Sequence, residues 1–307
     1  MNSWIDAGPT EVRVQGRLIR IARVRGDGYM FWNDPEAVLS GIRKSGVRVD
    51  LFTFVQRVSE TSPKYSFHME WDNFAALRIA SFEDWWDKQI GFKARNKAKQ
   101  AEKKGVVIRE VSFTSSLVEG IHQIYNETPV RQGGPNRHYG KSVQTVYEQT
   151  ATLIDNSIFI GAYLDESLIG FVRLVVDQTR TQAGVMEIAT MIRHRDKAVA
   201  NALVAQAVRV CAEREIPYLV YARFAYGKKQ TSSLSDFKER NAFQKIEVPR
   251  YYIPLTRMGE VALRFKLHHP LADHLPESMI SKIREMRASW YNRKLPLLAQ
   301  TASQEKS

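Results

Sequence analysis

The most regular pattern of apolar and polar residues in this chain predicts a helix that starts near residue 200. Apolar side chains recur there at spacings of three and four, which places them on one face of a helix. These residues are Ala200, Leu203, Val204, Ala207, Val208 and Cys211. We expect this face to be buried, with Cys211 as a small core residue.

Strands and further helices are expected on both sides of this helix. The strands cover 106–113, 158–164, 168–176, 185–192, 217–224 and 243–255, and the helices cover 116–125, a segment ending near 155, and 234–240. Ser116 and Glu119 fit a capping box. Asp165-Glu166-Ser167 fits a hairpin turn. The resulting order is β-α-α-β-β-β-α-β-α-β.

The first hundred residues predict a separate α+β region. A hairpin with strands at 12–14 and 18–22 is followed by a short helix at 35–44 and a strand at 48–55. One long basic helix is then expected over 82–104, ended by Gly105. Its buried stripe comprises Trp86, Ile90, Ala94, Ala98 and Ala101.

These elements divide the chain into three expected domains. Residues 1–104 form the N-terminal α+β region with its basic helix. Residues 105–255 form the mixed domain, and residues 256–307 hold an accessory helix at 276–293 and a polar tail.

The charge of the chain points to a class of partner. The 307 residues include 45 Lys and Arg against 33 Asp and Glu, a net charge of +12. Such a surface favours polyanions: nucleic acid, anionic lipid or a phosphorylated cofactor. A single cysteine excludes an intramolecular disulfide. No apolar stretch has the length of a membrane span and no signal peptide is recognised, so we expect a cytoplasmic protein.

The order of elements from Val106 to Leu255 resembles the GNAT (Gcn5-related N-acetyltransferase) superfamily. Residues 159–172, Phe-Ile-Gly-Ala-Tyr-Leu-Asp-Glu-Ser-Leu-Ile-Gly-Phe-Val, are similar to the family's central strand pair. Ala242-Phe243 stands where the family usually has Gly-Phe. The resemblance implies an α+β acyltransferase fold with a mixed, mostly antiparallel central sheet flanked by helices. The N-terminal α+β region and the C-terminal helix are extensions of it.

The resemblance also implies where an acyl-CoA, such as acetyl-CoA, binds. The family motif Arg/Gln-x-x-Gly-x-Gly/Ala corresponds to Arg195-Asp-Lys-Ala198-Val-Ala200, with alanine at the middle glycine. N–H groups and the dipole at a helix N-terminus can bind a pyrophosphate. Ala198 is expected to keep the space for it, without the positive φ of glycine. The implied cofactor-binding residues are Met191, Ile192, Arg193, Arg195, Lys197, Ala198, Val199 and Ala200; His194 contacts a phosphate or caps the strand.

A second resemblance is confined to the basic helix. Residues 93–106, Lys-Ala-Arg-Asn-Lys-Ala-Lys-Gln-Ala-Glu-Lys-Lys-Gly-Val, are similar to a basic helix of the FemAB-like branch of the same fold. That branch includes aminoacyl-tRNA-dependent enzymes that build peptidoglycan cross-bridges. The similarity implies that the basic residues of 88–104 bind tRNA. The alternative interpretation is a basic face that is only solvated, which would have the same composition.

Two carboxylates compete for the role of general base. Glu187 lies inside the strand at 185–192 among apolar neighbours, where burial would raise its pKa toward a catalytic range. Its alternative role is a structural pair with an arginine. Glu127 lies in the loop 126–140, which is long and rich in reactive side chains.

The loop 126–140 is also expected to border the acceptor. Its candidate substrate-binding residues are Arg131, Gln132, His138 and Tyr139, and His138 is expected to titrate near neutral pH. A mobile basic surface loop is the alternative. The family's usual acid, a tyrosine, is replaced here by Lys238, so Tyr226 is the candidate acid.

No metal site is expected, because His268, His269 and His274 have no carboxylate or cysteine at ligand spacing. The leading hypothesis is therefore an N-acyltransferase that moves an acyl group from a CoA thioester to an amine acceptor. The first alternative is a FemAB-like aminoacyl-tRNA-dependent aminoacyltransferase, and the second is a GNAT-fold binding module without catalysis.

Overall fold

The computed structural model describes residues 2–8, 10–27, 34–131, 134–224 and 233–269, with isolated positions between 279 and 290. The chain divides into two units. The first comprises residues 1–91, 174–186 and 208–273. The second comprises residues 92–173, 187–207 and 274–307. Both units are built from non-contiguous segments, whereas the three expected domains were contiguous.

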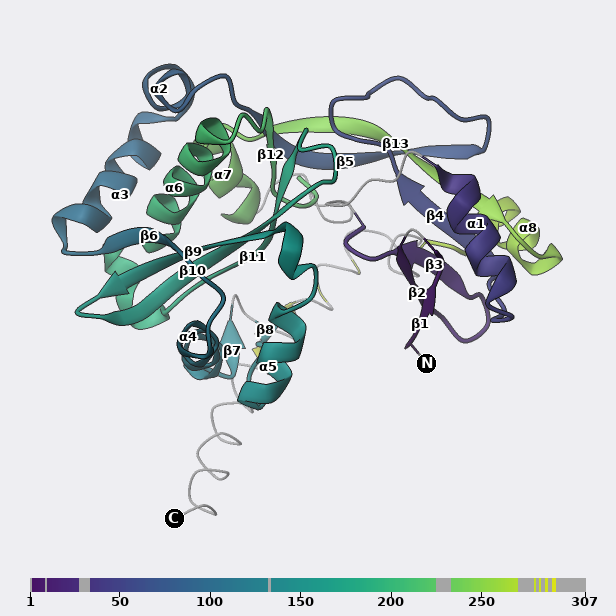
Figure 1. Ribbon diagram of the computed structural model, residues 1–307, viewed down its shortest axis with the longest axis horizontal. Helices are drawn as coiled ribbons and strands as arrows, with labels where there is room; N and C mark the ends of the chain where they lie inside the picture. The colour runs from purple at the N-terminus through teal and green to yellow at the C-terminus, as the bar shows by residue number, and fades with distance from the viewer. Residues whose placement is uncertain are drawn as a thin grey trace, which may run out of the picture. The chain divides into compact units, whose positions relative to one another are not determined.

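A large, mostly antiparallel sheet flanked by helices is the framework of the fold (Figure 1). In the first unit, neighbouring strands are β1 (Asn2–Asp6), β2 (Glu11–Gln15), β3 (Ile21–Val24), β4 (Leu51–Val55), β13 (Gln244–Pro254), β5 (His68–Arg78), β12 (Tyr218–Val220) and β11 (Ala183–Thr190). In the second unit, β11 is followed by β10 (Ser167–Val176), β9 (Ser157–Leu164) and β6 (Val107–Val111). Strands β10 and β11 run through both units.

Strand β11 pairs only briefly with its parallel neighbour β12. The register joins Ala183 to Leu219 and Gly184 to Val220, and β11 then continues to Thr190. Only the first two residues of this eight-residue strand are therefore in register with β12. The residues that follow the strand, Met191, Ile192 and Arg193, are among those that the resemblance implied for binding the acyl donor.

Helices cover both faces of the strands in the second unit (Figure 1). Helices α3 (Phe92–Lys103) and α6 (Val199–Glu213) lie on one side of β9 and β10, and α4 (Ser115–Asn126) and α5 (Val143–Thr150) lie on the other. Five of the six predicted residues of the stripe on α6 are buried, with Cys211 fully so, and Ala200 at its start is half-buried. With α7 (Ser233–Arg240) before β13, the element order confirms the predicted one.

The first unit has its own core. Helix α1 (Pro35–Lys44) spans the predicted residues and begins at Asp34, whose carboxylate accepts a hydrogen bond from the Ala37 N–H at 3.0 Å. Its buried face packs against β2, β3, β4 and β13 in one apolar cluster. Strands β2 and β3 form the predicted hairpin. Helix α8 (Arg257–Arg264), which packs on β13, was not predicted.

The expected single helix over 82–104 is wrong. Helix α2 (Phe82–Asp84) leads into a π-helical turn, Trp85–Gln89, and α3 starts only at Phe92. Tertiary hydrogen bonds explain the break, because the Trp85 indole donates to the Asn241 carbonyl at 3.2 Å and the Gly91 N–H donates to the Arg240 carbonyl at 3.1 Å. Trp85, not Trp86, is the buried tryptophan.

Three further differences concern local signals. Thr114, not Ser116, caps α4, and its hydroxyl accepts from the Leu117 N–H at 3.2 Å. Strands β1 and β5 were not predicted; β5 alternates polar and apolar residues only at its start and ends in the continuous apolar run 74–77, so it lacks one regular pattern. Most of the expected helix at 276–293 lies outside the described residues. Within the described part of the chain, no helix is both long and apolar enough to cross a membrane.

Candidate active site

The carboxyl group of Glu187 is buried in the second unit. Its Oε2 atom is buried and has no hydrogen-bond partner among the residues that the structure describes. The Tyr125 hydroxyl from α4 forms a hydrogen bond with the carboxyl group. Burial raises the pKa of Glu187, and the charges of Arg173 and Arg137 only partly oppose this shift. A carboxyl group with a raised pKa can accept and release a proton closer to neutral pH.

Arg173 is the arginine that a structural role for Glu187 would require. It is buried in β10, and its guanidinium donates to the Ser157 hydroxyl at 3.1 Å, with longer contacts to the Gln149 carbonyl at 3.4 Å and the Thr152 hydroxyl at 3.5 Å. It therefore acts on Glu187 through its charge, while its hydrogen bonds go to β9 and to the end of α5. An arginine inside the apolar run of β10 was a signal in the sequence that the prediction did not use.

His138 contacts the same tyrosine. Its ring stacks on Tyr125 with centroids 4.1 Å apart, and its Nε2 accepts from the Arg137 Nε at 3.0 Å. Burial, together with the nearby charges of Lys141 and Arg137, lowers the pKa of His138 to about 4. The expectation that His138 titrates near neutral pH is therefore wrong, and the imidazole is neutral at pH 7.

The described parts of the loop 126–140 are held by side-chain amides. The Asn136 side-chain amide donates to the Tyr125 backbone carbonyl at 2.7 Å, and the Asn126 side-chain Oδ1 accepts from the Gly140 N–H at 2.7 Å. A short hairpin, β7 (Val130–Arg131) and β8 (Gly134–Pro135), lies between them. The Tyr139 side chain is 40% exposed. Gln132 lies outside the described residues.

Glu127 braces the end of β11. Its carboxylate accepts hydrogen bonds from the N–H groups of Ile192 at 2.6 Å and Arg193 at 3.0 Å. Arg131 joins the same brace: its guanidinium donates to the Thr190 carbonyl at 2.9 Å and lies 3.4 Å from Glu127. Ile192 and Arg193 were expected to bind the donor, and in this structure their backbone N–H groups donate to Glu127.

The candidate donor site lies in the turn that precedes α6. A 3₁₀ turn, Ile192–Lys197, leads to Ala198, and α6 begins at Val199. Ala198 has a φ of +55°, so the expectation that alanine would not adopt positive φ here is wrong. Gly170 allows β10 to approach this point, because a Cβ there would lie 2.8 Å from the Val199 Cγ1. Met191 is buried, whereas Arg193 and Arg195 are exposed.

The end of the basic helix α3 contacts the same turn. The Lys104 ammonium lies 2.7 Å from the Asp196 carboxylate, and the Gln100 amide donates to the Asp196 carbonyl at 2.6 Å. Part of the positive charge of the basic helix, which was predicted to bind a polyanion, therefore lies beside the candidate phosphate site. The candidate acid Tyr226 lies outside the described residues.

Lys238, at the position of the family's tyrosine, belongs to the first unit. It is buried in α7, and its ammonium donates to the Arg223 carbonyl at 2.6 Å. Burial lowers its pKa to about 8.

The strand order, the brief pairing of β11 with β12 and the turn before α6 define a GNAT-type acyltransferase domain. Residues 118–230 match the model of the acetyltransferase (GNAT) family. Residues 118–230 are therefore a GNAT-type domain, and a domain of this type makes the protein an acyltransferase by class.

Solved structures extend the likeness over most of the chain. The C-terminal domain of a protein assigned as a lysylphosphatidylglycerol synthetase from Agrobacterium fabrum matches with a TM-score of 0.55 and 11% identity, covering 86% of each chain. L-PGS from Bacillus licheniformis matches with a TM-score of 0.54 and 11% identity, covering 85% of this chain and 87% of that one. FemX matches with a TM-score of 0.54 and 8% identity, covering 78% and 83%. Identities this low show the fold alone, and no curated protein matches the sequence.

Proposed function

We propose that this protein transfers an acyl group from a CoA thioester to an amine, with Glu187 as the general base. The observation that carries the proposal is the buried Oε2 of Glu187, which lacks a hydrogen-bond partner within the described residues. An amine must lose a proton as it attacks the donor's carbonyl carbon. Glu187 accepts that proton, the C–S bond breaks, and the CoA thiolate leaves. The raised pKa of Glu187 suits a group that must bind and release a proton.

The turn before α6 supports a phosphate-bearing donor. The first N–H groups of a helix are unpaired, and the positive end of its dipole attracts phosphates. Arg193 and Arg195 on this turn are exposed and positively charged. Ala198 adopts the left-handed conformation in which the family has glycine. These features fit the pyrophosphate of CoA.

Calorimetric titration of the purified protein with acetyl-CoA tests the donor. We expect saturable binding that Arg195→Glu weakens about tenfold or more, because it reverses a charge at the phosphate site. Ala198→Gly should tighten binding, since glycine adopts the positive φ without strain and lets phosphates approach. Absence of acetyl-CoA binding, or binding that Arg195→Glu leaves unchanged, would rule out this site.

An aminoacyl donor is the second candidate. It is favoured by two structures that match most of the chain, FemX and the C-terminal domain of a protein whose title names a lysylphosphatidylglycerol synthetase. The contact of Lys104 with Asp196 also brings the basic helix beside the donor turn. Under this function, deacylated tRNA binds with a steep salt dependence and acetyl-CoA does not bind. If neither ligand binds, a GNAT-fold module without catalysis becomes the better explanation.

We further propose that Glu127 is a positioning residue and not the base. Glu127→Gln should lower the free energy of unfolding by about 1–3 kcal/mol. The substitution replaces one of the two carboxylate oxygens that accept from the N–H groups of Ile192 and Arg193 with an amide group that only donates. The pH dependence of kcat should stay unchanged. Urea unfolding and a pH–rate profile check this, with the exposed Glu119→Gln on the same helix as control. A loss of kcat of about 100-fold with an altered pH profile would instead make Glu127 the base.

A further inference from the structure

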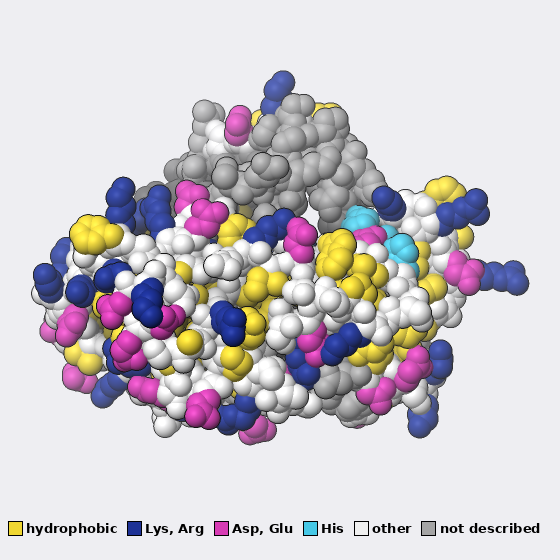
Figure 2. Space-filling model, turned by 90° about the horizontal axis from the view of Figure 1, so that it is seen from above, with side chains coloured by type: hydrophobic (Ala, Val, Ile, Leu, Met, Phe, Trp, Pro, Cys, Tyr) yellow, Lys and Arg dark blue, Asp and Glu magenta, His cyan; other side chains and the backbone are white. Residues whose placement is uncertain are grey.

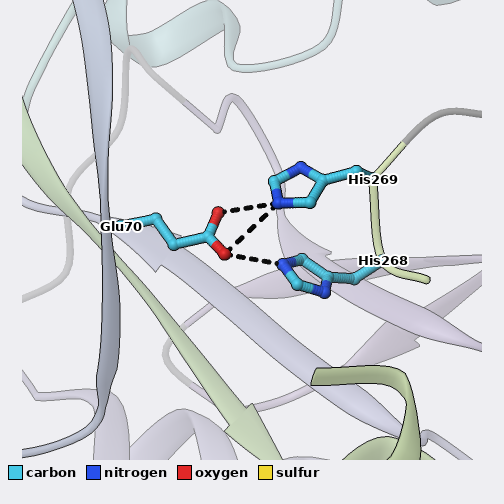
Figure 3. Close-up of side chains that lie close together, drawn as sticks. All are labelled: Glu70, His268 and His269. Carbon is cyan, nitrogen blue, oxygen red and sulfur yellow. Dashed lines mark hydrogen bonds and ion pairs between the residues drawn. The ribbon is translucent and has the colours of Figure 1, made fainter. Parts of the chain in front are cut away.

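Three potential metal ligands converge in the first unit. The Glu70 side chain comes from β5, and His268 and His269 follow α8 (Figure 3). The Nε2 of His268 lies 2.9 Å from the Glu70 Oε1, and the Nε2 of His269 lies 3.0 Å from Oε2 and 3.2 Å from Oε1. Both imidazoles therefore direct the same ring nitrogen at one carboxylate.

The other nitrogen of His268 is held by the backbone. Its Nδ1 lies 3.3 Å from the Ala262 carbonyl oxygen, and the side chain is fully buried. A carbonyl oxygen only accepts, so Nδ1 carries the hydrogen and, in the neutral imidazole, Nε2 carries the lone pair. Metal-binding histidines are oriented in the same way, by a hydrogen bond from the second ring nitrogen to a carbonyl or carboxylate.

A cation resolves the electrostatic conflict of this arrangement. The lone pair of a neutral His268 facing a carboxylate oxygen at 2.9 Å is repulsive unless a positive charge lies between them. That charge is either a proton on a buried imidazole or a metal ion. Burial of a charged imidazole carries a desolvation cost, which a metal ion bound by several ligands offsets.

We propose that Glu70, His268 and His269 bind one divalent transition-metal ion, for which Zn²⁺ is the best-fitting ion. Two imidazole nitrogens and a carboxylate oxygen are ligands that Zn²⁺ takes in proteins. The three ligand atoms lie within 4.8 Å of one another. In a tetrahedral site with bonds of about 2.0–2.1 Å, neighbouring ligand atoms lie about 3.3 Å apart. The separations between the histidine nitrogens and the Glu70 oxygens, 2.9 Å and 3.0 Å, require a widening of only a few tenths of an ångström.

His68 is the candidate for a further ligand. It lies two residues before Glu70 on β5, so both side chains are on the same face of the strand. Its Nε2 is 3.5 Å from the Glu70 Oε1, and its ring lies 6.4 Å from that of His268. Figure 2 shows histidine side chains together at the surface, next to an acidic side chain. An ion can therefore reach the cluster from solvent.

The site joins segments that are distant in sequence. Glu70 and His268 are separated by 198 residues, and the bound ion would fasten the chain after α8 to β5. A ligand that binds only the folded protein raises its stability. We infer a structural role, which does not depend on the proposed transferase activity.

Zinc titration tests the proposal. The full chain, freed of any affinity tag and stripped with a chelator, is titrated with ZnCl₂ by calorimetry. We expect one ion per chain, and at least about 100-fold weaker binding in His269→Ala and in Glu70→Gln, which each remove one of three ligands. His194→Ala, which removes a histidine of the second unit, should bind as the wild type does.

Thermal unfolding provides the second readout. Zn²⁺ should raise the Tm of the wild type and leave that of His269→Ala unchanged. His269 is partly exposed, so its truncation is tolerated better than that of the buried His268. If stoichiometric zinc binding is absent, or persists unchanged in both ligand variants, the proposal fails. The cluster is then an ion-pair arrangement in which protonated histidines pair with the Glu70 carboxylate.

Discussion

Glu187→Gln is expected to reduce kcat by about 10²–10⁴-fold, the range associated with removal of a general base. Glutamine has the same shape and can still accept the hydrogen bond from Tyr125, but it cannot take a proton from the acceptor amine. The measurement is the steady-state rate with the donor that binds in calorimetry and a panel of amine acceptors. Glu148→Gln, an exposed carboxylate on α5, is the matched control. Undiminished transfer in Glu187→Gln would exclude Glu187 as the base.

The raised pKa of Glu187 gives this prediction a pH dependence. Only the ionised carboxylate accepts a proton, so activity should rise as pH rises through the raised pKa, and this limb should vanish in the variant. Stability changes in the opposite direction. A group whose pKa is higher in the folded than in the unfolded protein stabilises the fold at low pH, and this contribution is lost as pH rises through the folded pKa.

Glu187→Gln should therefore unfold at a higher temperature than the wild type at neutral pH and above, since it removes the desolvation cost of a buried ionised carboxylate. Thermal unfolding at several pH values measures this. A variant that is inactive and also destabilised at every pH would point to a purely structural carboxyl.

Asp72→Asn is expected to lower the free energy of unfolding by about 3–5 kcal/mol, the cost of breaking a buried ion pair from one side. The Asp72 carboxylate lies 2.7 Å from the Arg250 guanidinium and 2.9 Å from that of Arg223. Arg250 is only 3% exposed and has one further carboxylate, Asp27, at 3.1 Å. The variant leaves a buried guanidinium with half of its countercharge. Urea unfolding gives the free energy directly.

An exposed ion pair on β13, the strand that holds Arg250, is the control for Asp72. Lys245 and Glu247 of β13 lie 2.7 Å apart, with about half of each side chain exposed. Solvent screening limits such a pair to about 0–1 kcal/mol, so Glu247→Gln should be nearly neutral. Equal effects of Glu247→Gln and Asp72→Asn would contradict the argument from burial.

The effect of Asp72→Asn should also depend on pH. Burial alone would raise the pKa of Asp72, but the guanidinium groups of Arg250 and Arg223 outweigh burial, and the pKa lies below its ordinary value. A lowered pKa contributes stability above the unfolded pKa of about 3.9, and this contribution is lost as pH falls through the folded pKa. The difference between wild type and variant should thus be largest near neutral pH and shrink in acid.

Much of the fold could be predicted because its signals are local. The stripe on α6, the limits of α1, the β2–β3 hairpin and the order of elements from β6 to β13 depend on residues a few positions apart. Glu187 was found in the same way, as a carboxylate inside a strand of apolar residues. Its raised pKa follows from burial, which that neighbourhood already indicated.

The surroundings of the site could not be predicted, because they join segments that are distant in sequence. The sequence shows neither that Tyr125 reaches Glu187 nor that Glu127 accepts from the N–H groups of Ile192 and Arg193. The low pKa of His138 has the same origin, since burial and two cations set it. Alanine at residue 198 favours negative φ in isolation, and the folded turn imposes +55°.

The sequence by itself determined the succession of helices and strands, the buried face of α6 and the position of a carboxylate within β11. Only the tertiary structure decided where the basic helix breaks and which N–H groups donate to the Glu127 carboxylate. It also decided that the Glu70 carboxylate lies beside the His268 imidazole. The physical reason is the range of the interactions. Periodicity and caps act over one or two turns of chain, whereas burial, charge pairing and side-chain hydrogen bonds depend on residues that only the folded chain brings together.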